Sequence, residues 1–167
     1  MRTLMVKRLE SSFFAFKESL GRFQKSCQNM LDMFANDRVF IAPDLDINKL
    51  KEDGLSDDAI LKKIEQKGGN NKEFKADAFT EDFIKKLKSD KKKIDSLLKR
   101  WGNITYDPKM DEFLKNLENT FFKKSKNHSG KLVIFTESTD TANEVKARLE
   151  EAGYSKILSI SSHNRET

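Results

Sequence analysis

The chain has 167 residues, 35% of them charged, with a net charge of +5 and one cysteine. Thirteen phenylalanines supply the regular apolar spacing that disordered chains lack, so we expect one folded domain, or one domain and a piece of a second. The single cysteine excludes an internal disulfide, and the distant His128 and His163 make a poor metal site, so we expect no bound metal. No apolar run is long enough to span a membrane, so we expect a soluble, cytoplasmic protein.

The first predicted element is one long helix with an apolar seam. Its apolar residues recur at alternating steps of three and four: Val6, Leu9, Phe13, Phe16, Leu20, Phe23, Cys27, Met30 and Phe34. At 1.5 Å per residue such a helix is about 45 Å long, so other helices must run along it to cover the seam. We expect Phe16 to be buried, and we interpret Cys27 as a buried apolar side chain rather than a nucleophile.

A connecting loop and a second helix follow. Residues 35–55 contain Pro43 and have no sustained period, which indicates a loop with at most a short helical turn. Ser56 is a suitable N-cap for the second helix, and Gly68 is a suitable end for it. Residues 68–72 are then expected to form a flexible break.

Two further helices complete a predicted helical bundle over residues 1–122. Thr80 is the expected cap of the third helix and Gly102 its end, with a seam of Phe83, Leu87, Ile94, Leu97 and Trp101. Asp107 followed by Pro108 predicts the start of the fourth. Its inward-facing residues are expected to be Met110, Phe113, Leu114, Leu117 and Phe121.

The character of the sequence changes after residue 122, and residues 123–167 are expected to form a second domain. Residues 132–135 are an unbroken apolar run typical of a buried parallel strand, and residues 157–160 resemble it. Residues 142–152 between them have helical spacing. The predicted fold class is therefore mainly α with a C-terminal α/β part, a helical bundle followed by a parallel β-α-β unit. Two strands alone do not form a stable open sheet. The chain is therefore expected to end inside a domain, or its helices are expected to cover the two-stranded sheet.

Positive charge is concentrated between Lys62 and Arg100, where thirteen basic residues face seven acidic ones and give a net charge of +6. A phosphate backbone attracts such a segment through charge and counterion release. The run Lys91, Lys92 and Lys93 is the best candidate for nonspecific contact with nucleic acid. The alternative is that these lysines form the solvated face of an amphipathic helix.

Three blocks of sequence stand out beside these elements. They are RTLMVKRLESSFFAFKESL at residues 2–20, YDPKMDEFLKNLE at 106–118 and GKLVIFTESTDTANEVKARLEEAG at 130–153. The sequences of these blocks, their order and their spacing resemble bacterial Swi/Snf-like superfamily 2 helicases, and RLESSFFAF is the most specific part. Residues 35–75 resemble no family. The resemblance implies an internal fragment of an ATP-dependent helicase or translocase, in which the third block contains motif IV at the start of the second RecA-like lobe. The implied partners are nucleic acid, taken to be DNA, and the remainder of the helicase core, with no membrane.

By this resemblance, motif IV contacts the nucleic-acid backbone through Thr136, Glu137, Ser138 and Thr139. Their place between a predicted strand and a helix agrees, since α/β proteins bind ligands there. Ser138 or Thr139 could instead cap the helix, and the charge of Glu137 repels a phosphate. Arg165, after the second predicted strand, could pair with a phosphate or lie in a solvent-facing loop.

The chain lacks the residues that hydrolyse ATP, so no catalytic residue is assigned. Its one Gly-Lys pair is at residues 130–131, and the glycine that a phosphate-binding loop needs upstream is Ser125. No acidic Mg²⁺ box is present either. ATP and Mg²⁺ are therefore cofactors expected for the parent protein, and none is expected in this chain.

Two other functional interpretations of single residues are weaker than structural ones. Asp107 and Lys109 could suggest a nuclease pair, but helix capping explains Asp107. Trp101 could stack on a base, but its place on a helical seam favours core packing.

The second hypothesis for the whole chain is a helical adaptor whose long seam docks a partner helix, with no nucleic-acid role. A reading frame that continues past Thr167 into glycine-rich and arginine-rich motifs favours the helicase, and a natural stop there favours the adaptor.

Overall fold

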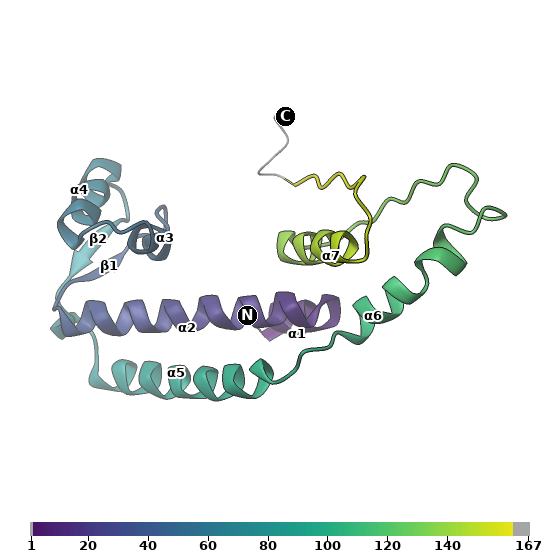
Figure 1. Cartoon of the computed structure of the whole chain (residues 1–167). Coiled ribbons are helices and arrows are strands. Elements are labelled where there is room, and N and C mark those ends of the chain that lie inside the picture. Colours follow the sequence, from purple (N-terminus) through teal and green to yellow (C-terminus); the bar gives the residue numbers. More distant parts are fainter. Residues whose placement is uncertain (1, 162–167) are drawn as a thin grey trace. The chain divides into compact units, whose positions relative to one another are not determined.

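The computed structural model describes residues 2–161, which are mainly helical (Figure 1). The elements in chain order are α1 (Arg2–Ser11), α2 (Phe13–Ala35), β1 (Val39–Ile41), α3 (Ile47–Glu52), α4 (Asp57–Lys67), β2 (Lys72–Phe74), the 3-10 helix η1 (Ala76–Ala78), α5 (Glu81–Gly102), α6 (Pro108–Lys115), the π-helix η2 (Leu117–Phe121) and α7 (Thr139–Glu151). None of the described helices combines the length and the apolar character that a bilayer crossing requires.

The chain divides into two compact units. Unit 1 combines Met1–Ser19 with Trp101–Thr167, and unit 2 is Leu20–Arg100. Unit 1 is therefore discontinuous in sequence, and unit 2 is a single stretch of chain. The domain boundary expected after residue 122 stays a prediction.

The predicted long helix is interrupted at Ser12, so the expectation of one unbroken helix over residues 6–34 is wrong at that residue. α1 ends at Ser11 and α2 begins at Phe13. The Ser12 hydroxyl accepts hydrogen bonds from the backbone N–H of Phe14 at 3.1 Å and of Ala15 at 3.3 Å. These are the bonds of an N-cap, which let a helix restart at little cost. Apolar spacing does not reveal such a break, because the seam continues across it.

Helix capping follows the sequence prediction at three other places. In each case a side-chain oxygen accepts from a backbone N–H of the first turn, and the capping residues are Ser56 for α4, Thr80 for α5 and Asp107 for α6. Gly68 ends α4 with φ of 62°, a left-handed conformation that glycine adopts without strain. These predicted boundaries are confirmed.

Unit 2 contains a two-stranded antiparallel sheet that the sequence did not predict. β1 pairs with β2, and Val39 lies opposite Phe74. Around β1 is the hydrophobic core of this unit, formed by Met33, Phe34, Val39, Phe40, Ile47, Ile60 and Ile64. Three-residue strands are shorter than the runs of four to eight that a strand pattern needs. β1 lies in the segment interpreted as a loop, and β2 begins at the last residue of the predicted flexible break.

Within unit 2, α2 and α5 lie side by side (Figure 1). Gln24 Nε2 donates to Asp95 Oδ1 at 2.7 Å, and the ring of Phe34 lies 5.0 Å from that of Phe79, edge to face. Cys27, on the seam of α2, is half-buried rather than fully buried. Burial raises the pKa of its thiol, which favours the apolar interpretation over a nucleophile.

The expected parallel β-α-β unit is absent from the described residues, so this part of the predicted fold is wrong. α7 forms where a helix was expected, but residues 132–135 and 157–160 are coil, and β1 and β2 are antiparallel. Val133 is 73% and Leu158 84% exposed. An apolar run becomes a buried parallel strand only where neighbouring strands and covering layers are available. Neither is available to these runs within residues 2–161.

Phe16 lies in the core of unit 1, as the seam predicts. It is 9% exposed, and its ring lies 4.8 Å from that of Trp101. Phe13 contacts the same indole, with ring centres 5.1 Å apart and planes at 89°. Trp101 is therefore packed between aromatic side chains, which supports core packing over base stacking.

Replacing Phe16 by alanine should lower the free energy of unfolding by about 3–5 kcal/mol, because it leaves a cavity beside Trp101. Urea unfolding followed by circular dichroism measures this loss. Val6→Ala is the control on the same seam; its side chain is 49% exposed, so the change should stay below about 1 kcal/mol. A loss for Phe16→Ala as small as for the control would show that the seam is not packed.

Candidate functional site

Two helix N-termini of unit 1 share one carboxylate. Asp107 Oδ1 caps α6 by accepting from the backbone N–H of Lys109 at 3.2 Å and of Met110 at 3.3 Å. Its other oxygen, Oδ2, accepts from the backbone N–H of Phe13 at 2.8 Å, at the start of α2. The negative charge stabilises the positive ends of both helices. Both carboxylate oxygens of Asp107 thus accept hydrogen bonds from helix starts, which agrees with the capping interpretation rather than a nuclease pair.

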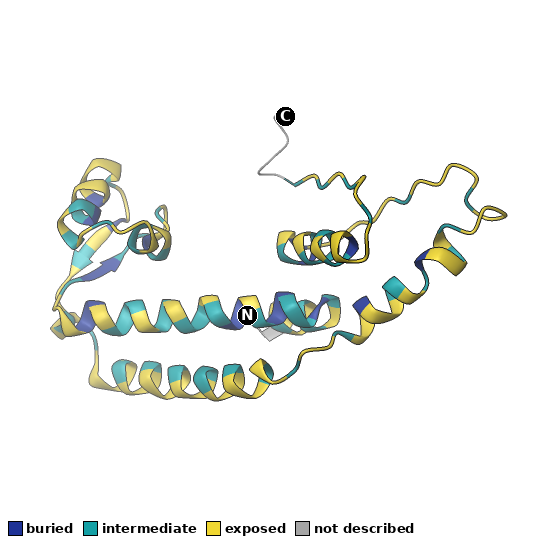
Figure 2. Ribbon diagram, in the orientation of Figure 1, coloured by how far each residue is buried: buried dark blue, intermediate teal, exposed yellow. Residues whose placement is uncertain are grey.

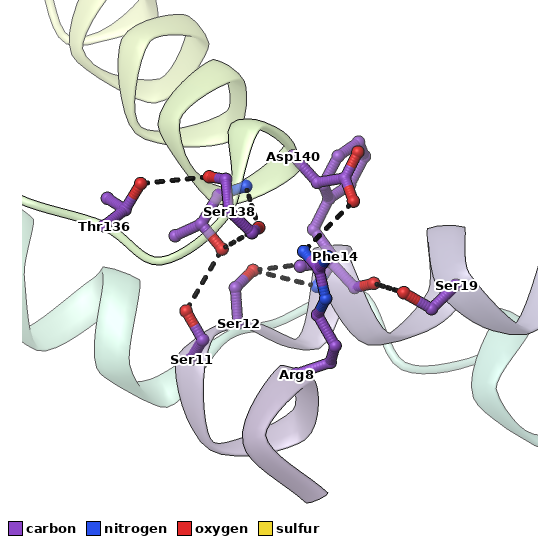
Figure 3. Close-up of polar contacts among 10 residues, drawn as sticks. Arg8, Ser11, Ser12, Phe14, Ser19, Thr136, Ser138 and Asp140 are labelled. Carbon is purple, nitrogen blue, oxygen red and sulfur yellow. Dashed lines mark hydrogen bonds and ion pairs between the residues drawn. The ribbon is translucent and has the colours of Figure 1, made fainter. Parts of the chain in front are cut away.

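The start of α7 joins α1 through polar side chains (Figure 3). Ser11 Oγ lies 3.1 Å from Thr141 Oγ1, and Arg8 Nη1 lies 3.4 Å from Asp140 Oδ2 as an ion pair. Both charged side chains are about one quarter exposed, at 25% and 24%. These contacts connect segments about 130 residues apart, and no local pattern in the sequence could have identified them.

The four residues assigned to motif IV differ in whether their side chains are exposed and able to contact a ligand. Ser138 is buried, and its Oγ accepts from the backbone N–H of Thr141 at 3.1 Å, so the capping alternative is confirmed for Ser138. Thr136 Oγ1 donates to the carbonyl oxygen of Ser138 at 2.9 Å (Figure 3). Thr136, Glu137 and Thr139 are exposed. Thr136 and Thr139 are therefore the accessible candidates of this turn for contact with a phosphate backbone, whereas the negative charge of Glu137 repels one.

A pocket of about 470 Å³ lies beside this turn in unit 1. Its charged lining residues are Lys7, Glu10, Asp107, Lys109 and Glu137. Three carboxylates against two lysines give no net attraction for a phosphate. The described residues also contain no cluster of three His, Cys, Asp or Glu side chains that could bind a metal ion. We assign this pocket no anion and no metal.

The run of lysines on α5, in unit 2, does not form one surface. Lys91 Nζ pairs with Asp95 Oδ2 at 2.8 Å, and Lys93 Nζ pairs with Asp90 Oδ1 at 3.2 Å. The hydrogen bond from Lys91 also lowers the pKa of Asp95. Lys92 is exposed and makes no ion pair with any residue that the structure describes. Both lysines are thus paired within the helix, and only Lys93, with its side chain 71% exposed against 22% for Lys91, fits the solvated-face interpretation.

Unpaired positive charge on α5 instead follows helical spacing. Lys88, Lys92 and Lys99 are separated by four and seven residues, which places them on one face of the helix. All three are exposed, and within residues 2–161 none of them forms an ion pair. We call these three residues the α5 basic stripe. Of these three residues, the sequence analysis named only Lys92, because it followed consecutive lysines rather than spacing of four and seven.

Arg165, the remaining predicted nucleic-acid contact, lies outside the described residues.

The chain matches no protein-family model, no curated protein and no solved structure.

Ser138→Ala should lower the free energy of unfolding by about 1 kcal/mol, because it leaves the backbone N–H of Thr141 without its cap acceptor. Thr139→Ala, at the neighbouring exposed position, should change it by less than about 0.5 kcal/mol. Urea unfolding of both variants measures the difference. Equal losses would mean that the cap does not stabilise α7.

Proposed function

We propose that this protein is the helical and motif IV-containing part of an ATP-dependent nucleic-acid helicase or translocase of the Swi/Snf-like superfamily 2 type. In this role it contacts the nucleic-acid backbone, taken to be DNA, and other parts of the helicase core hydrolyse ATP. The proposal includes a cytoplasmic location.

One observation carries the proposal: the blocks of sequence that resemble this family, far apart in the chain, come together in one unit. Residues 106–118 and 130–153 belong to unit 1, as do all residues of the 2–20 block except Leu20. They are joined by the bond from Phe13 to Asp107, by the Ser11–Thr141 contact and by the Arg8–Asp140 ion pair. The resemblance is thus concentrated in a contiguous part of the structure.

The segment without any resemblance belongs to the other unit. Residues 35–75 lie in unit 2, where they contribute β1, β2, α3 and α4. A family-specific core interrupted by a variable insertion would have this distribution. The division into units therefore supports the proposal independently of the wording of the blocks.

Nucleic-acid contact is proposed through the α5 basic stripe and through the exposed residues of the motif IV turn. Exposed lysines that lack a carboxylate partner can neutralise phosphates and release counterions, whereas paired lysines must first give up their ion pairs. Such contacts position a protein on nucleic acid without reading bases. Binding should accordingly be independent of sequence.

ATP hydrolysis is assigned to other parts of the core because phosphoryl transfer needs a phosphate cradle, Mg²⁺ ligands and a group that stabilises the developing charge. The sequence contains no glycine-rich phosphate-binding loop. In the proposal, ATP and Mg²⁺ are therefore bound by the remainder of the helicase.

No specific observation favours the adaptor hypothesis. Its docking surface would be the seam of α2, but Phe16 already packs against Trp101 in unit 1, and Phe34 packs against Phe79 in unit 2.

The full 167-residue chain should bind fluorescently labelled duplex DNA weakly, with an affinity that falls steeply between two salt concentrations. Replacing Lys88, Lys92 and Lys99 by glutamine should make the slope of log K against log salt less steep by about 3, because each neutralised phosphate accounts for about 0.9 of that slope. Fluorescence anisotropy measures both slopes. Affinity that barely changes with salt would contradict the electrostatic account.

A matched control removes the same charge from lysines that already have partners. Lys85, Lys86 and Lys93 form ion pairs with Glu81, Asp82 and Asp90 on the same helix. Their triple replacement by glutamine should change the slope by less than about 1, because these lysines are already neutralised. Equal effects of the two triple variants would show that net charge, and not the α5 basic stripe, determines binding.

The isolated chain should not release phosphate from ATP, with or without DNA, in a coupled phosphate assay. Measurable turnover that persists after further purification would overturn the assignment of catalysis to other residues. The helicase assignment itself is tested by the reading frame that encodes the chain. A phosphate-binding glycine loop before these residues and an arginine-containing motif after them would support it, and a frame with neither would overturn it.

A further inference from the structure

Residues 131–137, which we call the edge segment, form part of the exposed coil between η2 and α7 (Figure 2). Its central residues, Leu132–Phe135, make no backbone hydrogen bond with any residue that the structure describes. Within residues 2–161, the N–H and C=O groups of these four residues therefore have no backbone partner, as at the edge of a sheet. Such an edge is a template for pairing with another strand.

Most side chains of the edge segment are exposed, and only Leu132 is half-buried. Val133 is 73% and Phe135 is 93% exposed, whereas Ile134 between them is 39% exposed and Leu132 less. Successive side chains of an extended chain point to opposite sides. In a strand formed by this segment, Val133 and Phe135 would share one side, and Lys131 and Glu137, both exposed, would lie at the two ends of that side.

We propose that the edge segment pairs with the edge segment of a second copy of this chain, as two antiparallel strands centred on Ile134. In this register Val133 lies opposite the second copy's Phe135, and Lys131 lies opposite its Glu137. Two-fold symmetry makes each of these pairs occur twice. Apolar and opposite-charge pairs directly across two strands both stabilise pairing.

Charge complementarity identifies the second copy as the occupant. The edge segment has a positive residue at one end and a negative one at the other. A second copy of the segment, running antiparallel, therefore places opposite charges across from each other at both ends. A shift of one residue would place Lys131 opposite Thr136 and remove the match, so the register is specified by the charges. The other exposed apolar run, residues 157–160, follows Lys156 but has no acidic residue through Ser161, and it lacks this symmetry.

Sedimentation equilibrium of the full chain tests the pairing. The average mass should rise with concentration from 19.3 kDa toward twice that value. Lys131→Glu and Glu137→Lys should each weaken self-association by about tenfold, because each replaces two attractive pairs by two repulsive ones. The double variant Lys131→Glu/Glu137→Lys recreates opposite charges and should recover the original affinity to within about threefold.

Leu158→Thr is the matched control, since it removes another exposed apolar side chain outside the edge segment. It should leave self-association unchanged. A chain that stays monomeric at every concentration would overturn the proposal and leave the segment to a different partner. Single reversals without rescue in the double variant, or equal weakening by Leu158→Thr, would also overturn it. Because Lys131 and Glu137 are exposed, the unfolding temperature of each variant should match that of the parent chain.

Discussion

The carboxylate of Asp107 is the interaction on which the arrangement of unit 1 depends. Its two oxygens accept three backbone N–H groups, from Phe13 in α2 and from Lys109 and Met110 in α6. These helix starts are 94 residues apart in sequence, and each has backbone donors that lack a partner within its own helix. One negative charge between two positive helix ends stabilises both. With α2 fixed in this way, the end of α1 lies where Ser11 can contact Thr141 in α7.

Helix positions could be predicted from the sequence because their signals are local. The caps at Ser56, Thr80 and Asp107 and the burial of Phe16 depend on spacing within one or two turns. The second hydrogen bond of Asp107 could not be predicted, since capping rules identify an acceptor but not a donor in a distant segment. β1 and β2 were missed for a different reason: a strand of three residues has no period to recognise.

The expected parallel β-α-β unit is wrong because it assumed neighbours that residues 2–161 do not supply. An apolar run such as residues 132–135 predicts a buried strand only if other strands and layers surround it. Consecutive lysines predict a charged patch only if their side chains point the same way, and on a helix they diverge by about 100° per residue. For the candidate site, the capping alternative at Ser138 was available from the sequence. The α5 basic stripe required the positions of the carboxylates that neutralise the other lysines.

The discontinuity of unit 1 has a consequence for the order in which the protein folds as it is synthesised. Unit 2 is one stretch of chain, so its core around Val39 and Ile60 can form as soon as Leu20–Arg100 has left the ribosome. The N-terminal segment of unit 1 emerges before unit 2 but must wait for Trp101 and Asp107 before its own contacts exist. During that interval Phe13 and Phe16 lack their aromatic partner. A folded unit 2 would shorten the effective loop that has to close, and so lower the entropic cost of completing unit 1.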